Sequence, residues 1–291
     1  MFTLLKGFEK SIEFNKNILF IHIPKCGGTT VDRIITEYIQ SSNHSEYSFY
    51  RFKEDFNNLT KFIKENNSDL YFVSGHNQEN LLDIFKHDLF KFAIVRDPIS
   101  MFISHYKFHI FRSKIDIKKF NIENFIEFQK KLFNDNLIVR FFSNNLNNKK
   151  KLNSSDLDNA IINAKNIDLL VDYSNWNLAL NIIISLMNLP NILYSNYQSI
   201  KYDFNYNVSK LDKNLIKSFC LLDIEFYNQV FKKNKIYFKD EYSINFNKIR
   251  NENNFIFCSP FIENLDKQKK VFSREDFEKL INKLKISYKE F

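Results

Sequence analysis

Glycine and proline are scarce in this chain: four of each serve 291 residues, which are rich instead in Asn, Lys, Ile and Phe. Most turns must therefore be made without glycine. Where a glycine does stand, we expect the backbone to need a positive φ or room for a ligand against the main chain. Three of the four, Gly27, Gly28 and Gly75, lie in two short segments. These segments are the first place to look for function.

Cysteine is also scarce, since Cys26, Cys220 and Cys258 are odd in number and far apart. Neither a disulfide framework nor metal-binding spacing is visible in this pattern, which fits a reducing compartment. The N-terminus lacks the apolar core of a signal peptide, and the apolar stretch 178–189 is too short to span a bilayer. We therefore expect a cytoplasmic protein with no integral membrane segment.

The net charge of +8 favours an anionic partner, such as a nucleotide, an acidic glycan, nucleic acid or a membrane surface. It does not choose among them. The densest basic run, Lys149 to Lys151, stands in an Asn-rich stretch that indicates a solvated loop. We therefore expect no nucleic-acid partner. The oligomeric state is open, a homo-oligomer included.

Short apolar runs alternate with helical patterns along the chain. Strands are expected at 17–23, 70–73 and 92–95, with weaker signals at 167–171 and 191–194. Helical spacing marks 54–66, 79–87, 98–112, 121–133, 136–145, 156–165, 175–188 and 210–233. This alternation predicts an α/β fold of three layers, with a mainly parallel central sheet flanked by helices. We expect one domain over 1–250, with 251–291 as an extension that ends in a helix and packs on it.

The sequence IPKCGGTT, at residues 23–30, follows the first expected strand and opens a helix. The free N–H groups of such a turn and the helix N-terminus attract an anion such as phosphate. Lys25 adds a positive charge, and Thr29 and Thr30 add hydroxyl donors. The nucleotide-triphosphate loop would need Gly-Lys-Ser/Thr, which is absent. The alternative is a tight turn with a surface lysine.

The sequence VRDPISMFISHY, at residues 95–106, follows another expected strand. Pro98 suits the first turn of a helix, and Ser104 lies two turns further on. The guanidinium of Arg96 and the hydroxyl of Ser104 can bind a second phosphate together. The alternative is that Arg96 pairs with Asp97 or another carboxylate.

Together the two motifs resemble those of sulfotransferases that use 3′-phosphoadenosine 5′-phosphosulfate (PAPS). The first resembles the family's 5′-phosphosulfate loop, and the second its 3′-phosphate motif. The spacing of the second is kept at Arg96, Asp97, Pro98, Ser104 and Tyr106. Met101 departs, because it stands where the family usually has a second Arg. The resemblance implies a topology similar to that of the P-loop kinases.

A strand ending in Gly75-His76 between these motifs resembles bacterial relatives of the heparan sulfate and uronyl 2-O-sulfotransferases. In that group the His after this Gly is the proposed base, so the resemblance assigns His76 to that role. Segments 136–143 and 222–227 resemble later parts of the family, so the likeness covers about 17–235. Independently, sulfuryl transfer to a hydroxyl needs a base, and His has a pKa near 6.5. Glu79 is an alternative base.

The other histidines have simpler interpretations. His22 alternates within the first strand and is expected in the core. His105 and His109 fall beside the Arg96 helix, where packing or surface exposure is favoured; His105 is also a candidate contact for the substrate. His44 and His87 lie in polar stretches.

Arg140 is one charge within the apolar run LIVRFF. A charge there must find a partner or reach a cleft, so it contacts the acceptor or PAPS, or it forms an internal salt bridge. Cys26 lies inside the anion loop, where the family tolerates varied small residues, and we assign it no nucleophilic role.

The resemblance thus implies a PAPS-dependent sulfotransferase in which Lys25 and His76 are catalytic. The residues expected to bind PAPS are Lys25, Cys26, Gly27, Gly28, Thr29, Thr30, Arg96 and Ser104. The acceptor would be a carbohydrate, such as a uronic acid or another sugar of a cell-surface polysaccharide or its lipid-linked precursor. The product would be adenosine 3′,5′-bisphosphate, and no metal is required. A nucleotide-dependent kinase and a non-catalytic PAPS- or anion-binding protein remain the alternatives.

Overall fold

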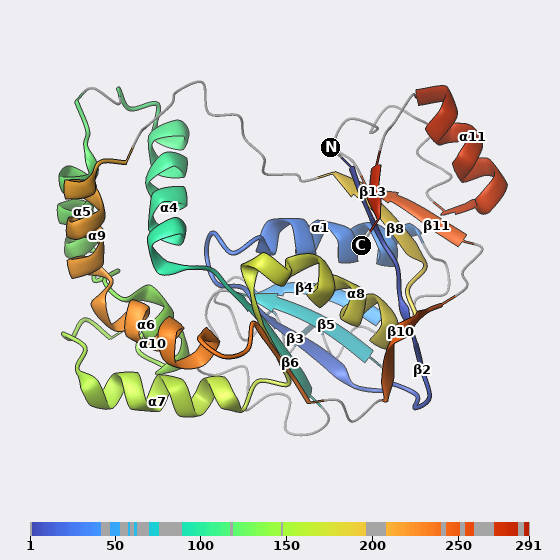
Figure 1. Ribbon diagram of the computed structural model, residues 1–291, viewed down its shortest axis with the longest axis horizontal. Helices are drawn as coiled ribbons and strands as arrows, with labels where there is room; N and C mark the ends of the chain where they lie inside the picture. The colour runs from blue at the N-terminus through green and yellow to red at the C-terminus, as the bar shows by residue number, and fades with distance from the viewer. Residues whose placement is uncertain are drawn as a thin grey trace.

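The computed structural model of the chain contains a central sheet, a second sheet beside it, and helices between and around them (Figure 1). It describes residues 2–41, 47–52, 58, 61–62, 70–75, 89–116, 119–146, 148–195, 208–239, 243–250, 254–258, 271–284 and 288–290. The expected helix at 79–87 lies outside these ranges, and so does most of the one at 54–66.

The central sheet has six described strands, in the order β4-β5-β3-β6-β7-β9. They are β4 (Tyr47–Phe52), β5 (Leu70–Gly75), β3 (Asn17–Ile21), β6 (Leu89–Val95), β7 (Leu169–Asp172) and β9 (Ile236–Phe238). All neighbours are parallel except β9, which runs antiparallel to β7. The mainly parallel α/β sheet predicted from the apolar runs is therefore confirmed.

The register of these strands brings their carboxyl ends to one edge. Ile21 of β3 pairs with Gly75 of β5, and Val95 of β6 pairs with Asp172 of β7. The loops that follow these residues therefore leave the sheet together, which is where ligands bind in open α/β sheets.

The helices fall into groups around the central sheet. Their bounds are α1 (Gly28–Ser41), α4 (Pro98–Ser113), α5 (Ile122–Lys131), α6 (Leu137–Phe142), α7 (Ser154–Lys165), α8 (Trp176–Leu186), α9 (Lys210–Phe219) and α10 (Leu221–Phe231). α8 contacts β7 of the central sheet, and it also contacts β1 (Phe2–Leu5) and β2 (Phe8–Lys10). α4, α5 and α9 stand together to the left in Figure 1 and share a separate apolar core that includes Tyr106 and Phe125.

The helix expected over 210–233 is two helices, which meet at Cys220 without a glycine or proline. The cause is a reciprocal cap between α6 and α10. The side-chain oxygen of Asn136 accepts from the N–H groups of Leu222 and Asp223, at 2.8 and 3.3 Å. In return, Asp223 Oδ1 accepts from the N–H of Val139 at 2.8 Å. These bonds satisfy some of the free N–H groups at the starts of both helices.

A second sheet has the strand order β12-β11-β8-β1-β13 among the described residues. Its strands are β1 (Phe2–Leu5), β8 (Asn191–Ser195), β11 (Asn254–Cys258), β12 (Val271–Ser273) and β13 (Tyr288–Glu290). The expected strand at 191–194 therefore pairs here, antiparallel to β1, and is not in the central sheet. β2 (Phe8–Lys10) pairs with β10 (Ile244–Ile249), and α11 (Arg274–Leu284) follows β12.

The C-terminal segment is joined to the rest of the fold by strand pairing. β11 pairs with β8 and β13 pairs with β1, so described parts of 251–291 lie within the second sheet. The domain boundary at residue 250 stays a prediction.

Turns are made largely without glycine, as expected from its scarcity. Seven described non-glycine residues have a positive φ: Lys25, Lys114, Phe133, Asn136, Asn144, Asn188 and Ser243. Asparagine supplies three of them because its short amide side chain tolerates the left-handed region. Among the described residues, no helix is both long and apolar enough to cross a membrane.

Candidate functional site

The loop after β3 needs glycine at position 27 for two reasons. Gly27 has φ +87°, and its carbonyl accepts from the N–H of Thr30 at 3.0 Å, which starts α1. A Cβ at Gly27 would lie 2.6 Å from Trp176 Nε1. The left-handed backbone and the close approach both exclude a side chain.

Gly28 is required for a different contact. A Cβ there would lie 2.0 Å from Cδ2 of His22, so the imidazole rests against the main chain of the loop. His22 is buried, as the alternation of the first strand predicts, and its Nδ1 lies 3.4 Å from Asp32 Oδ2. Trp176 thus packs against Gly27, and His22 packs against Gly28.

The two sequence motifs meet at one cavity of about 280 Å³. Five of the expected cofactor-binding residues line it: Lys25, Gly27, Thr30, Arg96 and Ser104. They come from the loop after β3, the start of α1, the end of β6 and α4. Their roles stay predictions, but the sheet register brings them together.

Arg96 is positioned by the end of β6 and by the cap of α4. Asp97 is the N-cap of α4: its Oδ1 accepts from the N–H of Ser100 at 2.8 Å. This oxygen is therefore used by the helix and not by the guanidinium of Arg96. The guanidinium carbon of Arg96 lies 4.9 Å from the ring centroid of Tyr173. Arg96 and Tyr173 both line the cavity, so the positive charge lies there next to the face of an aromatic ring.

Lys25 is held in the left-handed region, with φ 65°. Its Nζ lies 3.9 Å from the ring centroid of Phe108 on α4. Burial, and then the charge of Arg96, lower the pKa of Lys25 to about 8. A bound anion would counter both effects, so this lysine is suited to an anionic ligand.

Part of the cavity wall was missed by sequence reasoning. Tyr173, Trp176, Asn177 and Tyr194 also line it. The Trp176 and Tyr194 ring centroids are 5.3 Å apart, and the Tyr194 hydroxyl donates to Asn177 Oδ1 at 2.8 Å. The one available signal was the only tryptophan of the chain, shortly after the expected strand at 167–171.

Cys26 and Met101 turn away from this cavity. The Cys26 thiol is buried, with Sγ 3.9 Å from Met101 Sδ, and burial raises its pKa to about 12. A neutral buried thiol is no nucleophile, in keeping with the absence of an assigned role. Thr29 is half-buried and is not among the residues that line the cavity.

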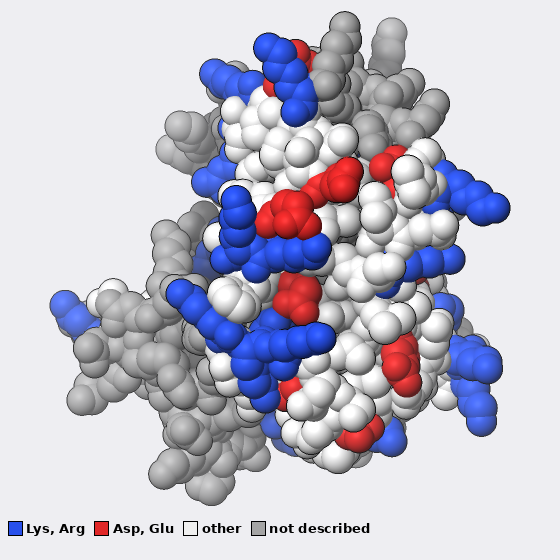
Figure 2. Space-filling view, turned by 90° about the vertical axis from the view of Figure 1, so that its left-hand side faces the viewer, with Lys and Arg blue, Asp and Glu red and all other residues white. Residues whose placement is uncertain are grey.

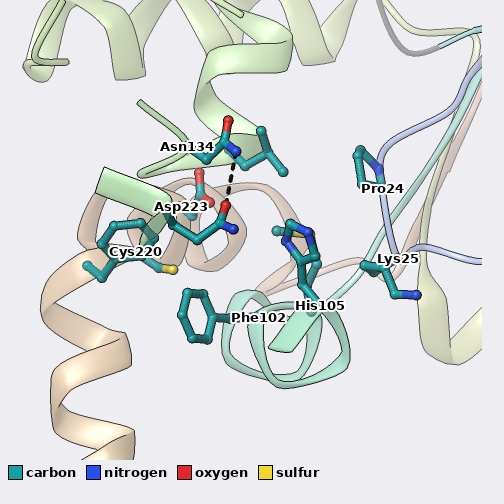
Figure 3. A pocket seen from close by; sticks show the side chains of 11 residues that line it. Pro24, Lys25, Phe102, His105, Asn134, Cys220 and Asp223 are labelled. Carbon is teal, nitrogen blue, oxygen red and sulfur yellow. Dashed lines mark hydrogen bonds between the residues drawn. The ribbon is translucent and has the colours of Figure 1, made fainter. Parts of the chain in front are cut away.

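A second, smaller cavity of about 20 Å³ lies on another side of Lys25 (Figure 3). His105 points into it from α4, and the lining also includes Asp223 from α10. Burial, followed by the charges of Lys25 and His109, lowers the pKa of His105 to about 4, so the ring is neutral at pH 7. His105 thus neighbours Lys25, and its predicted contact with a substrate stays a prediction.

Asp223 is fully buried beside this cavity. Its Oδ1 caps α6, whereas its Oδ2 has no hydrogen-bond partner among the described residues. Burial raises the pKa of this carboxyl to about 7, and hydrogen bonds from the backbone of α6 oppose the shift. The adjoining cavity of about 20 Å³ has room for about one water molecule.

Arg140 is an internal residue with 1% of its surface exposed. Its Nη2 lies 2.6 Å from Asp135 Oδ1, and its guanidinium also donates to the carbonyls of Asp135, Asn148 and Lys150 at 2.9, 3.0 and 2.9 Å. It lines neither cavity. Of the two interpretations of Arg140, the structure favours the internal salt bridge over contact with a substrate.

The predicted base, His76, lies outside the described residues, as do Glu79, His44 and His87. The strand that leads to His76 is described: β5 ends at Gly75, whose carbonyl accepts from the N–H of His22 at 3.0 Å. His109 packs among phenylalanine rings, in keeping with its expected packing role. Within the described ranges, no three His, Cys, Asp or Glu side chains are grouped so as to hold a metal ion.

Comparison with known proteins adds independent information. The model of the sulfotransferase family matches residues 11–289. Among solved structures, a sulfotransferase from Alicyclobacillus acidocaldarius is similar with a TM-score of 0.43 and 10% identity, over 75% of this chain and 96% of that one. Among curated proteins, none matches the sequence significantly. Because the family model spans nearly the whole chain and both anion motifs lie within it, this chain belongs to the sulfotransferase family.

Proposed function

We propose that this protein transfers a sulfuryl group from PAPS to a hydroxyl of a carbohydrate acceptor. One observation carries the proposal. Among the described residues, the lining of the cavity of about 280 Å³ has two cations, Lys25 and Arg96, together with hydroxyl and amide groups, and no carboxylate. A ligand with several anionic groups and one flat ring matches such a lining.

In this proposal the 5′-phosphosulfate lies on residues 25–30, against the N-terminus of α1. Arg96 and Ser104 bind the 3′-phosphate. The adenine lies toward the aromatic wall, where Trp176 and Tyr194 offer ring surface and Asn177 an amide. The two motifs thus bind the two ends of one donor.

The reaction is a displacement at sulfur. The acceptor oxygen forms a bond to sulfur while the bond from sulfur to the bridging phosphate oxygen breaks. His76 takes the hydroxyl proton, and adenosine 3′,5′-bisphosphate leaves. The ammonium of Lys25 stabilises the charge that grows on the leaving phosphate, so positioning and electrostatics supply most of the catalysis. No step uses a metal ion.

A carbohydrate acceptor is supported by the resemblance at Gly75-His76 to enzymes that sulfate uronic acids. The net charge of +8 suits an acidic or lipid-linked glycan. The face seen in Figure 2 shows Lys and Arg side chains with Asp and Glu between them. On this face, negative side chains therefore interrupt the positive ones, and an acidic chain would meet separate basic groups and not a continuous basic patch.

The donor assignment is tested by binding of radiolabelled PAPS to the purified protein. We expect the wild type and Lys151→Ala to bind, because Lys151 is an exposed lysine outside the cavity. Lys25→Ala should abolish binding. Equal binding by Lys25→Ala would exclude the loop assignment, and binding of Mg²⁺-ATP in place of PAPS would favour a kinase.

The base is tested separately from the donor site. His76→Ala should retain affinity for adenosine 3′,5′-bisphosphate and lose turnover by about 10²–10⁴-fold, the usual contribution of a general base. Turnover is followed by PAPS consumption against glycans of the source organism. Full activity of His76→Ala would assign the base elsewhere. Bisphosphate binding with no turnover on any glycan would favour a non-catalytic binding protein.

A further inference from the structure

A buried polar cluster lies beneath the anion loop and takes no part in the scheme above. Asp32 on α1 is its centre, and His22, Arg51 and Ser74 surround it. Asp32 and His22 are each 4% exposed and Ser74 is 0% exposed, while the Arg51 side chain reaches solvent. The four side chains come from four different segments: the end of β3, α1, β4 and β5.

The two oxygens of the Asp32 carboxylate interact differently with this cluster. Oδ1 accepts from the hydroxyl of Ser74 at 2.5 Å. Oδ2 lies at ion-pair distance from two nitrogen atoms, 3.4 Å from His22 Nδ1 and 3.5 Å from Arg51 Nε, and it accepts no hydrogen bond among the described residues. One carboxylate thus joins the helix of the anion loop to three strands of the central sheet.

The partners of Asp32 touch both halves of the proposed transfer site. His22 carries the ring that rests against Gly28 of the anion loop. Ser74 stands one residue before Gly75, which leads to the predicted base His76. A shift of Asp32 would therefore displace the donor loop through His22 and the strand end before His76 through Ser74.

Stability alone is a weak reason for such a cluster. A buried carboxylate is costly to desolvate, and apolar residues of similar size are often as stabilising as a buried ion pair. What a shared carboxylate does supply is fixed geometry, because each partner must keep its distance and direction to it. Transfer reactions are sensitive to such geometry: a shift of about 1 Å can cost on the order of 10²-fold in rate.

We propose that Asp32 is a positioning residue that keeps the donor loop and the base-bearing strand end in register. This inference rests on the proposed function, since it takes residues 25–30 as the donor loop and His76 as the base. His22 carries the coupling to the donor, and Ser74 carries the coupling to the base. Arg51 balances the charge of the carboxylate.

The test compares variants of the cluster with a matched control. Asp156 is also 4% exposed, and its carboxylate accepts from Asn145, Lys150 and the N–H of Asn153, but it lies on α7 and does not line the cavity. Asp156→Asn therefore reports the general effect of losing a buried carboxylate. The readouts are the thermal midpoint, the affinity for adenosine 3′,5′-bisphosphate by calorimetry, and kcat and KM with PAPS, all below the midpoint of every variant.

The proposal predicts a split between the two sides of the cluster. Asp32→Asn should lower kcat by about 10- to 100-fold. Ser74→Ala should lower kcat and leave bisphosphate affinity within about twofold, whereas His22→Asn should weaken bisphosphate affinity several-fold. Asp156→Asn should lower the midpoint without changing either constant. If Asp32→Asn does not fold, Ser74→Ala and His22→Asn still test the proposal, because the first should change kcat and the second bisphosphate affinity.

Two results would overturn the inference in different ways. The first is that kcat, KM and bisphosphate affinity stay within twofold of the wild type in Asp32→Asn, Ser74→Ala and His22→Asn, while the thermal midpoint falls as in Asp156→Asn. The cluster would then have a purely structural role. Failure of the wild type itself to bind the bisphosphate would instead overturn the proposed function, and the coupling with it.

Discussion

Replacement of Arg140 by methionine separates a structural role from a role in binding substrate. Five hydrogen bonds leave its guanidinium, to Asp135, Asn145, Asn148 and Lys150, at distances from 2.6 to 3.5 Å. Methionine fills much of the same volume but satisfies none of these acceptors. Removing one partner of a buried ion pair costs about 3–5 kcal/mol; Asp135 is 28% exposed and can be rehydrated, so we expect a loss toward the lower end of this range.

This cost converts into a measurable shift of the thermal midpoint. At about 2–4 °C per kcal/mol for a domain of roughly this size, the Arg140→Met midpoint should fall by about 6–20 °C. Arg140→Lys keeps the charge but cannot bridge several acceptors, so its midpoint should lie between. Activity measured below the midpoints should be close to that of the wild type.

Arg274→Met is the control for loss of an arginine. Arg274 lies on the surface of α11, where it pairs with Glu278 one turn along, and such a pair contributes about 0.3–0.5 kcal/mol. Its midpoint should barely move. If Arg140→Met melts within about 2 °C of the wild type and instead raises the KM for the acceptor, the structural reasoning is refuted and Arg140 binds substrate.

Three further changes probe the site through charge and space. Because the pKa of Lys25 is about 8, affinity for adenosine 3′,5′-bisphosphate should fall above pH 8 by up to about tenfold per pH unit, and calorimetry should show a flatter profile for Lys25→Arg. Gly28→Ala should place a Cβ 2.0 Å from the His22 ring and cost about 1–3 kcal/mol in a thermal melt, with weaker bisphosphate binding; an unchanged midpoint would contradict the packing. The pKa of Asp223 is raised from 3.8 to about 7, so the folded state binds more protons than the unfolded state between these values, and the unfolding free energy should fall as pH rises through this window. Urea unfolding at pH 5 and pH 8 should show this fall in the wild type and little of it in Asp223→Asn, whose amide oxygen can still accept from Val139.

The sequence was most informative where local chemistry decides structure. The apolar run of β3, the glycine pair and the Asp97-Pro98 helix start each specify their own backbone. Parallel pairing then brings the three motif-bearing strand ends to one edge. Five residues that line the cavity of about 280 Å³ could therefore be named from the sequence, because the motif spacing and the α/β pattern together fix where they emerge.

Other features depend on contacts between segments far apart in sequence. The break at Cys220 follows from the side chain of Asn136, more than eighty residues earlier, which caps α10. The aromatic wall needs β8, which joins the second sheet by pairing with β1, to present Tyr194 beside Trp176. Arg140 was ambiguous because three of its five hydrogen bonds go to carbonyls of the later segment 145–150, whose path no local pattern specifies.

The pairing of β1 with β13 has a consequence for the order in which the protein can fold during synthesis. Strands β3 to β7 of the central sheet are complete once Asp172 has been made. β1, in contrast, is made before any of them, yet one of its edges is closed only by Tyr288–Glu290. Until the ribosome has released that segment, the nascent chain carries an unpaired apolar strand edge, which is a site for chaperone capture or for aggregation.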